Sequence, residues 1–272
     1  MASQTKVREM IAKNNAKKGG LSDKIVPIIL AIISAISILT TIAILFTLLT
    51  ETITFFTRVP LSKFFLSGTW NPTGSSPEFG IWALIIGTLK ITVIATIVAV
   101  PIGLGAAIYL NEYASDRSRR IIKPILEILA GIPTIVFGFF ALTFITPILR
   151  NLIPNLGEFN SISPGIVVGI MIVPMITSMS EDAMSSVPDK IREGAFGLGA
   201  TKFEVATKVV LPAATSGVVA SIVLGISRAI GETMIVSLAA GSSPTSSLSL
   251  TSSIQTMTGY IVEIATCLLY TS

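Results

Sequence analysis

The sequence predicts an all-α polytopic membrane protein, and three observations lead to this fold class. Of its 272 residues, 51% are hydrophobic and only 12% are charged, and the mean hydropathy is +0.81. A soluble domain carries about twice that share of charged residues, because its surface needs them. Several apolar runs also reach the ~20 residues that a helix needs to cross a bilayer. This composition excludes a disordered chain and an ordinary soluble globule.

Residues that carry much of enzyme chemistry are absent from the sequence. It contains no histidine, and Cys267 is the only cysteine. An intrachain disulfide, a Cys/His zinc site, a haem held by histidine and catalysis by a Ser-His or Cys-His pair are therefore excluded. The nucleotide-phosphate-binding pattern G-x4-G-K-[S/T] is also missing. We expect no catalytic residues, metal or cofactor in this chain.

Five apolar runs predict transmembrane helices. The first, Ile25–Leu49, carries no charge and is too long for a signal-peptide core, and we expect its helix to continue to residue 56. The next four runs cover residues 81–110, 125–149, 164–184 and 216–240. A sixth run begins near Ile254 and reaches the end of the sequence after 19 residues, so we expect a truncated sixth helix there.

Basic residues predict on which side of the membrane each connecting segment lies. Fourteen of the 19 Lys and Arg residues fall in residues 1–24, 117–123 and 190–208, which are alternate segments. Because positive charge is retained on the cytoplasmic side, we expect a cytoplasmic N-terminus and a basic arm over residues 1–24. Residues 57–80 then form an external loop, and residues 81–272 form the membrane core. We expect contact with membrane lipid and none with nucleic acid.

Tryptophans and a serine-rich loop mark the other side of the membrane. Trp70 and Trp82 suit the interfacial belt, either as simple anchors or in contact with an external partner. The loop 241–253 is polar and uncharged, and we expect it to be flexible.

The most informative segment is residues 187–212, which lies on the predicted cytoplasmic side. Charged and apolar positions alternate through it in a way that suits two short amphipathic helices, with Gly199 at the bend between them. Pro212 is expected at the start of the fifth span, where a missing N–H costs nothing. Without a protein partner, such a segment would lie on the membrane surface.

This segment resembles the cytoplasmic signature of ABC-importer permeases, E-A-A-x3-G-x9-I-x-L-P. Glu193, Ala195 and Gly199 fill the Glu, second Ala and Gly positions, and Leu211 and Pro212 close the motif. Gly194 replaces the first Ala and Val209 replaces the Ile. The resemblance implies that the segment seats in a groove of a cytoplasmic ATPase. The residues implied for this coupling site are Arg192, Glu193, Ala195, Phe196, Leu198, Gly199, Lys202, Leu211 and Pro212.

Within that segment we expect different roles. Ala195, Phe196 and Leu198 are expected to pack on the ATPase and Gly199 to make the bend. The charged Arg192, Glu193 and Lys202 are expected to set register and rim contacts.

A narrower resemblance covers roughly residues 60–240. The blocks SGTWNP, FGIWALIIGTLK, KPILEILAGIPTIVFGFFAL, GIMIVPMITSMSEDAM and SRAIGETM are similar to phosphate-importer permeases of the PstC type. The resemblance implies the type I ABC-importer permease fold, in the plasma (inner) membrane of a bacterium or archaeon. It further implies a PstA-like partner subunit, two cytoplasmic ATPase subunits that bind ATP and Mg²⁺, and an external phosphate-binding protein.

Two charges inside the predicted fifth span, Arg228 and Glu232, are the candidate substrate pathway. A charge at the bilayer centre costs about 3 kcal/mol on insertion scales. Their i,i+4 spacing would place them on one helix face, where they could neutralise each other. Either they form a structural ion pair, or Arg228 meets the phosphate oxyanion and Glu232 holds Arg228 in place.

Other charges near the membrane are weaker candidates. Lys90 either snorkels or lines the pathway. Glu181 and Asp182, at the end of the fourth span, are candidate gate or ion-pair groups. Glu127 is expected to pair locally with Lys123. Residues 131–133, a Gly-Ile-Pro sequence, are the expected hinge of the third span.

Three competing functions remain open from the sequence. The first is an ABC permease for another oxyanion, such as sulfate or molybdate. The second is an ATP-independent secondary transporter or channel, which gives no reason for the pattern over residues 193–212. The third is an assembly or signalling subunit that moves nothing.

Overall fold

The computed structural model describes residues 21–72 and 74–271. Side chains are described for residues 25–72 and 74–267. The chain divides into two compact units, one up to Leu61 and one from Ser62 onward. Most of the basic arm predicted at residues 1–24 lies outside the described residues.

The first unit is built on one long helix, α2 (Leu21–Arg58). Its apolar part, Ile25–Arg58, has 34 residues and would extend about 51 Å at 1.5 Å per residue. That exceeds the ~30 Å hydrocarbon core of a bilayer, so a helix more than long enough to cross lies where the first span is predicted. Threonine hydroxyls such as that of Thr40 donate to the carbonyl one turn earlier, which satisfies them within the helix.

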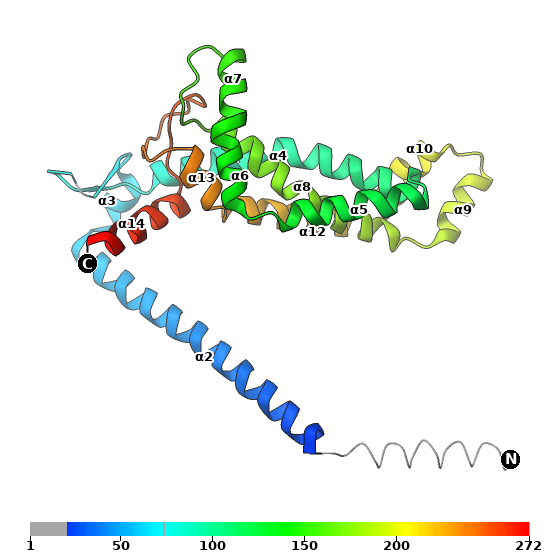
Figure 1. The fold of residues 1–272 in the computed structure, drawn as a ribbon, viewed down its shortest axis with the longest axis horizontal. Helices are drawn as coiled ribbons and strands as arrows, with labels where there is room; N and C mark the ends of the chain where they lie inside the picture. Colours follow the sequence, from blue (N-terminus) through cyan, green and yellow to red (C-terminus); the bar gives the residue numbers. More distant parts are fainter. Residues whose placement is uncertain (1–20, 73, 272) are drawn as a thin grey trace. The chain divides into compact units, whose positions relative to one another are not determined.

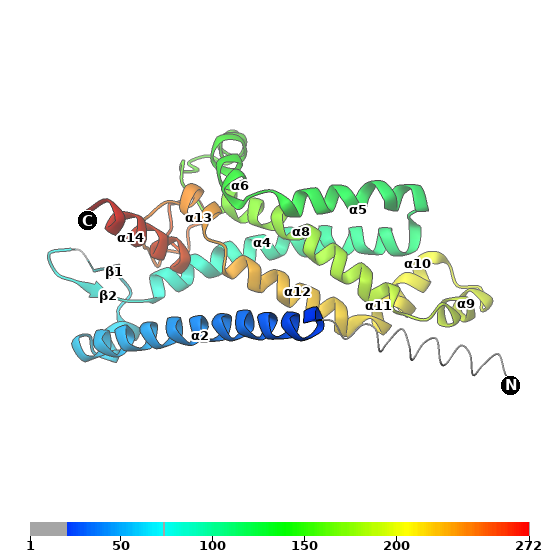
Figure 2. The same ribbon diagram turned by 60° about the horizontal axis from the view of Figure 1, so that its bottom comes forward.

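The second unit is a bundle of helices (Figure 1 and Figure 2). Its centre is formed by α4 (Trp82–Ile108), α8 (Ile162–Ser185) and α12 (Thr215–Ile230), which pack on one another, and α5 (Asp116–Gly131) lies along α8. Ile91, Ile172 and Ile176 are almost fully buried in the main apolar cluster. A smaller apolar cluster lies at one end of the bundle, around Met184, Val205 and Val210.

Glycines let these helices approach closely. A Cβ on Gly103 would lie 2.9 Å from Ile176 Cγ2, and one on Gly225 would lie 2.9 Å from Ile176 Cδ1, so α4 and α12 both contact α8 through this isoleucine. Gly138 is similarly close to Leu238. A Cβ on Gly105 would meet nothing within 4 Å. Gly103 and Gly138 therefore lie in close helix contacts, whereas Gly105 does not.

Gly103 and Gly105 form a matched pair of sites in α4. We expect Gly103→Leu to lower the thermal stability of the detergent-solubilised protein, because the side chain would overpack against Ile176 at a cost of about 1–3 kcal/mol. Gly105→Leu should not lower stability, since its side chain would enter open space. Equal losses in the two variants would contradict this account of helix packing.

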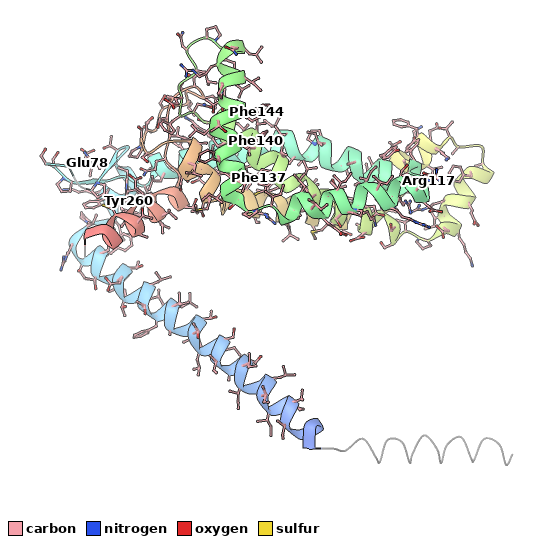
Figure 3. The ribbon with its side chains drawn as sticks, in the orientation of Figure 1. Glu78, Arg117, Phe137, Phe140, Phe144 and Tyr260 are labelled. Carbon is pink, nitrogen blue, oxygen red and sulfur yellow. The ribbon has the colours of Figure 1, made fainter. Side chains whose placement is uncertain are left out.

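The predicted third span is wrong in its boundaries. The helix over residues 125–149 is interrupted at Ile132 and Pro133, and α5 ends at Gly131. Ile132 is extended (φ −67°, ψ 129°), which is the conformation that a following proline favours. A new span begins there, formed by α6 (Thr134–Phe140), the π-helical turn η2 (Ala141–Ile145) and α7 (Thr146–Leu152). In Figure 3, Phe137, Phe140 and Phe144 mark its course away from α5.

The predicted fifth span is also broken. Lys202–Ala213 form a helical segment that meets α12 at a bend of 76°. α12 ends at Ile230, and a separate helix, α13 (Met234–Ala239), follows three residues later. The described residues hold four helices that are long and apolar enough to cross a membrane, or five if the bent pair is one span. The all-helical membrane fold is confirmed, and α14 (Met257–Thr271) lies where the truncated sixth helix is expected.

One end of the bundle carries the segments predicted to be external. Between α2 and α4, helix α3 (Leu61–Leu66) is followed by a hairpin in which β1 (Trp70–Asn71) pairs antiparallel with β2 (Glu78–Phe79). Trp70 lies opposite Phe79 and makes an edge contact with Tyr260 of α14. Figure 3 shows Glu78 and Tyr260 at this end and Arg117, in a predicted cytoplasmic segment, at the other.

The loop 241–253, expected to be flexible, is tied to the bundle. The Gly157 amide donates to the Thr251 carbonyl at 2.9 Å, and the Ser161 amide donates to the Leu250 carbonyl at 3.2 Å. Lys90 Nζ, from α4, donates to the carbonyls of Ser247 and Ser249. The loop is therefore held by backbone bonds and by a buried lysine.

Candidate translocation and coupling site

The coupling segment begins with α9 (Asp189–Gly197), which ends in a Schellman motif. The Gly199 amide donates to the Phe196 carbonyl at 2.9 Å, and the Ala200 amide donates to the Ala195 carbonyl at 3.2 Å. Gly199 itself has φ +85°, a left-handed conformation that only glycine adopts readily. The bend predicted at Gly199 is confirmed.

The second half of the segment starts with a capping box. The Thr201 hydroxyl accepts from the Glu204 amide, and the Glu204 carboxylate accepts from the Thr201 amide. Helix α10 (Lys202–Glu204), the π-helical turn η3 (Val205–Val210) and α11 (Leu211–Ala213) follow without a break. Pro212 therefore lies in the first turn of α11, and α12 begins only at Thr215.

Apolar side chains of this segment divide between two faces. Leu198 is 92% exposed and Phe203 is 67% exposed, and Phe196 and Glu193 are also exposed. These exposed side chains fit the expected packing surface for an ATPase. Ala195 does not, because it packs against the protein's own apolar cluster around Met184.

Other coupling residues can be placed in the same way. Leu211 packs on the same internal cluster, and Lys202 is exposed. A shallow groove of about 410 Å³ runs beside the bend; its lining includes Leu198, Gly199, Lys208 and Val209.

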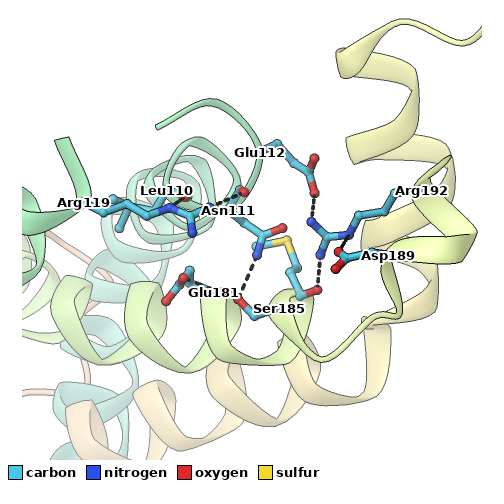
Figure 4. A network of polar contacts seen from close by, with 9 residues as sticks. Leu110, Asn111, Glu112, Arg119, Glu181, Ser185, Asp189 and Arg192 are labelled. Atoms are coloured by element: carbon cyan, nitrogen blue, oxygen red, sulfur yellow. Dashed lines mark hydrogen bonds and ion pairs between the residues drawn. The ribbon is translucent and has the colours of Figure 1, made fainter. Parts of the chain in front are cut away.

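Arg192 is the clearest correction within the segment. It was expected to set contacts at the rim, and it instead turns into the protein, with its side chain only 15% exposed. Its Nη1 lies 3.0 Å from Glu112 Oε1, and its Nη2 donates to the Met184 carbonyl at 2.7 Å (Figure 4). The inward position follows from the helical period, which places Arg192 on the same side of α9 as Ala195.

The pairing expected between Arg228 and Glu232 is wrong. Arg228 lies in the last turn of α12, whereas Glu232 lies beyond its end, so the two do not share one helix face. Glu232 is buried, and its Oε1 accepts from the amides of Met234 and Ile235 at 3.1 and 3.3 Å. It caps α13. The side chain of Arg228 is exposed and takes part in no ion pair among the residues that the structure describes.

Removing the cap on α13 has a defined expected effect. Glu232→Ala should lower the thermal stability of the solubilised protein by about 1 kcal/mol, because two amides lose their acceptor. Glu232→Gln keeps a side-chain oxygen and should be much milder. Equal loss in the two variants would argue that the carboxylate charge, and not the cap, is what matters at this position.

Arg228 lines a cavity of about 200 Å³ together with Lys123 and Glu181. Lys123 Nζ lies 2.7 Å from Glu181 Oε2, and Glu181 is 3% exposed. Glu127 also lines the cavity. The sequence spacing had suggested that Glu127 pairs with Lys123, but the partner of Lys123 is Glu181. The cavity is lined mainly by apolar side chains from α5 and α8, with these charges among them.

The remaining candidate charges, Glu181, Asp182 and Lys90, do not pair with one another. Glu181 is confirmed as an ion-pair group, whereas Asp182 is exposed. Lys90 is buried and binds backbone carbonyls of the loop 241–253, so it neither snorkels nor pairs with a carboxylate among the described residues.

Two members of the site were missed by sequence reasoning. Glu112 partners Arg192, and Lys123 partners Glu181, in each case across more than 50 residues of sequence. Their only sequence signal was a charge at the edge of a basic segment, which does not identify a partner in space.

The fold and this arrangement define a membrane transport component. Residues 99–271 match the family described as "Binding-protein-dependent transport system inner membrane component". The chain belongs to this family. It is a membrane-embedded transport subunit.

Two relatives with known names are similar in sequence to this chain. "Phosphate transport system permease protein PstC" of Haemophilus influenzae is 37% identical over 200 residues, which are 66% of this chain and 63% of that protein. "Probable ABC transporter permease protein YqgH" of Bacillus subtilis is 38% identical over 180 residues, which are 66% of this chain and 58% of that protein. This chain therefore spans about three fifths of the length of these relatives.

A solved structure also aligns with the chain. The inward-facing MetNI methionine ABC transporter aligns with a TM-score of 0.46 and 22% identity, over 56% of this chain and 71% of that chain.

Proposed function

We propose that this chain is a permease subunit of an ATP-driven importer of inorganic phosphate. The observation that carries the proposal is the coupling segment. The permease signature occurs in it with the expected spacing, its glycine has the left-handed conformation that the bend needs, and Leu198 and Phe203 are exposed beside that bend. Relatives of about 37% identity are named phosphate transport permeases.

The proposed assembly has four kinds of partner around this chain. They are a PstA-like permease subunit, two cytoplasmic ATPase subunits, an external phosphate-binding protein and membrane lipid. ATP and Mg²⁺ would be bound on the ATPases, since this chain has no phosphate-binding loop. The N-terminus and the coupling segment would lie in the cytoplasm of a bacterium or archaeon, as the distribution of basic residues predicts.

Within this chain, Arg228 is the residue that we assign to the anion. Its planar guanidinium matches the oxygens of phosphate, and it lies beside a cavity where Lys123 adds a second positive charge. Glu181 pairs with Lys123 at this cavity and would keep the pathway from binding anion too tightly to release it.

A permease for another oxyanion is the second candidate. The relative from Bacillus subtilis, which is 38% identical, is named only as a probable ABC transporter permease. Phosphate uptake in cells that depend on this importer tests the choice. We expect excess sulfate and molybdate to leave phosphate uptake unchanged; strong competition by either would favour the second candidate.

A further inference from the structure

Besides the apolar packing of Ala195, polar contacts of Arg192 join the coupling helix α9 to the rest of the bundle. The Arg192 guanidinium pairs with Glu112 in the π-helical turn η1 (Tyr109–Tyr113) and donates to the Met184 carbonyl near the end of α8. A weaker contact, at 4.0 Å, links its Nε to Asp189 within α9. The guanidinium therefore binds groups of three different elements, at the ends of α4 and α8 and on α9 itself (Figure 4).

The same end of the bundle carries further polar contacts that lead toward the cavity. Asn111 Nδ2, beside Glu112, donates to Ser185 Oγ at 3.0 Å, and Ser185 Oγ donates to Glu181 Oε1 at 3.4 Å. Glu181 in turn pairs with Lys123, which lines the cavity with Arg228.

A second arginine fixes the turn that bears Glu112. Arg119, at the start of α5, donates to the carbonyls of Leu110 and Asn111 at 2.7 and 2.6 Å. These carbonyls belong to the turn where the hydrogen-bond pattern of α4 changes to π-helical, and such turns leave carbonyls open to other donors. Arg119 thus fixes the backbone of the turn that contains Glu112, independently of the contact between Glu112 and Arg192.

Burial makes the Arg192–Glu112 pair stiff. The side chains are only 15% and 6% exposed, so water can compensate for little of the lost attraction when the two charges separate. Separating a buried pair leaves an uncompensated charge at a large cost in free energy. A displacement of α9 is therefore expected to carry the ends of α4 and α8 with it rather than to break the pair.

We propose that Arg192 is a positioning residue that transmits displacement of α9 to α4 and α8 through Glu112. Arg192 acts inside the permease and not on the surface proposed to face the ATPase, where Leu198 and Phe203 are exposed. The proposal rests on the proposed function, since it concerns how ATPase motion reaches the pathway. The Arg192–Glu112 ion pair has to stay intact for ATPase motion to reach the translocation pathway.

A double-mutant cycle tests the proposal in the complete transport complex reconstituted into liposomes. The variants are Arg192→Gln, Glu112→Gln and the double variant, with phosphate moved per ATP hydrolysed as the readout. Each single variant should lower this ratio about tenfold while ATP hydrolysis continues. The double variant should be no worse than either single one, because both remove the same contact.

Lys190→Gln is the matched control. Lys190 lies on α9, is exposed, and makes no hydrogen bond or ion pair within the described part of the chain, so its replacement should leave the ratio unchanged. If Arg192→Gln fails to retain the ATPase, copurified ATPase becomes the readout of the same cycle, and Glu112→Gln should then cause an equal loss.

Two results would overturn the proposal while the proposed function stands. One is a wild-type value for Glu112→Gln, and the other is a double variant whose loss equals the two single losses multiplied. A wild-type complex that moves no phosphate would overturn the proposed function, and this proposal with it.

Discussion

Replacement of Gly199 by leucine is expected to separate the permease from its ATPase. Gly199 has φ +85°, and a side chain in the left-handed region costs about 1–2 kcal/mol. That cost lowers the ratio of bent to unbent conformations roughly five- to thirtyfold. With the bend lost, Leu198 and Phe203 no longer project together from the end of the bundle. Copurification of the ATPase, and with it phosphate uptake, should fall by a similar factor.

Steric conflict is excluded as the cause of that loss, because a Cβ on Gly199 would meet nothing within 4 Å. Gly199→Asn should therefore be milder than Gly199→Leu, since asparagine tolerates the left-handed conformation. Gly105, in α4 and outside the signature, also has open space around it. Gly105→Leu is the control and should leave ATPase copurification unchanged. Normal copurification with Gly199→Leu would show that the bend is not needed for docking.

Arg228→Gln is expected to reduce phosphate uptake while the complex stays assembled. A hydrogen bond to a charged group contributes about 1.5–3 kcal/mol, so the loss should be roughly 10- to 100-fold. Assembly should survive because Arg228 is exposed and forms no ion pair with any residue that the structure describes. Its removal therefore leaves no carboxylate without a partner.

Arg150→Gln is the matched control for this prediction. Arg150 is an exposed arginine in the last turn of α7 and does not line the cavity that contains Arg228. Its replacement should leave uptake unchanged. Uptake at the wild-type rate in Arg228→Gln would make Arg228 a structural charge and would remove the assigned anion contact.

Local signals in the sequence predicted the bend of the coupling segment, but not the inward positions of Arg192 and Ala195. The bend depends on Gly199 and on the capping residues around it, all within a few positions of one another, so spacing alone was enough. The long apolar runs likewise predicted α2, α4 and α8. These features rest on composition and on contacts between near neighbours in sequence.

Predictions failed where they needed a partner from another element or an unbroken helix. Arg228 and Glu232 were placed on one face because a continuous helix was assumed, but α12 ends between them. Gly231 follows the last helical residue, which is a typical position for glycine at a helix end. The inward position of Arg192 and the pairing of Lys123 with Glu181 depend on how helices pack, and no local pattern encodes that.

The measurement that tests the account most directly is phosphate uptake by liposomes that contain the complete complex. ATP is supplied on the ATPase side and the phosphate-binding protein on the other. The account predicts uptake only when both are present, with the ATPase copurifying with this chain. Uptake that continues without ATP, or a chain that transports phosphate with no ATPase bound, would contradict it and would favour a secondary transporter.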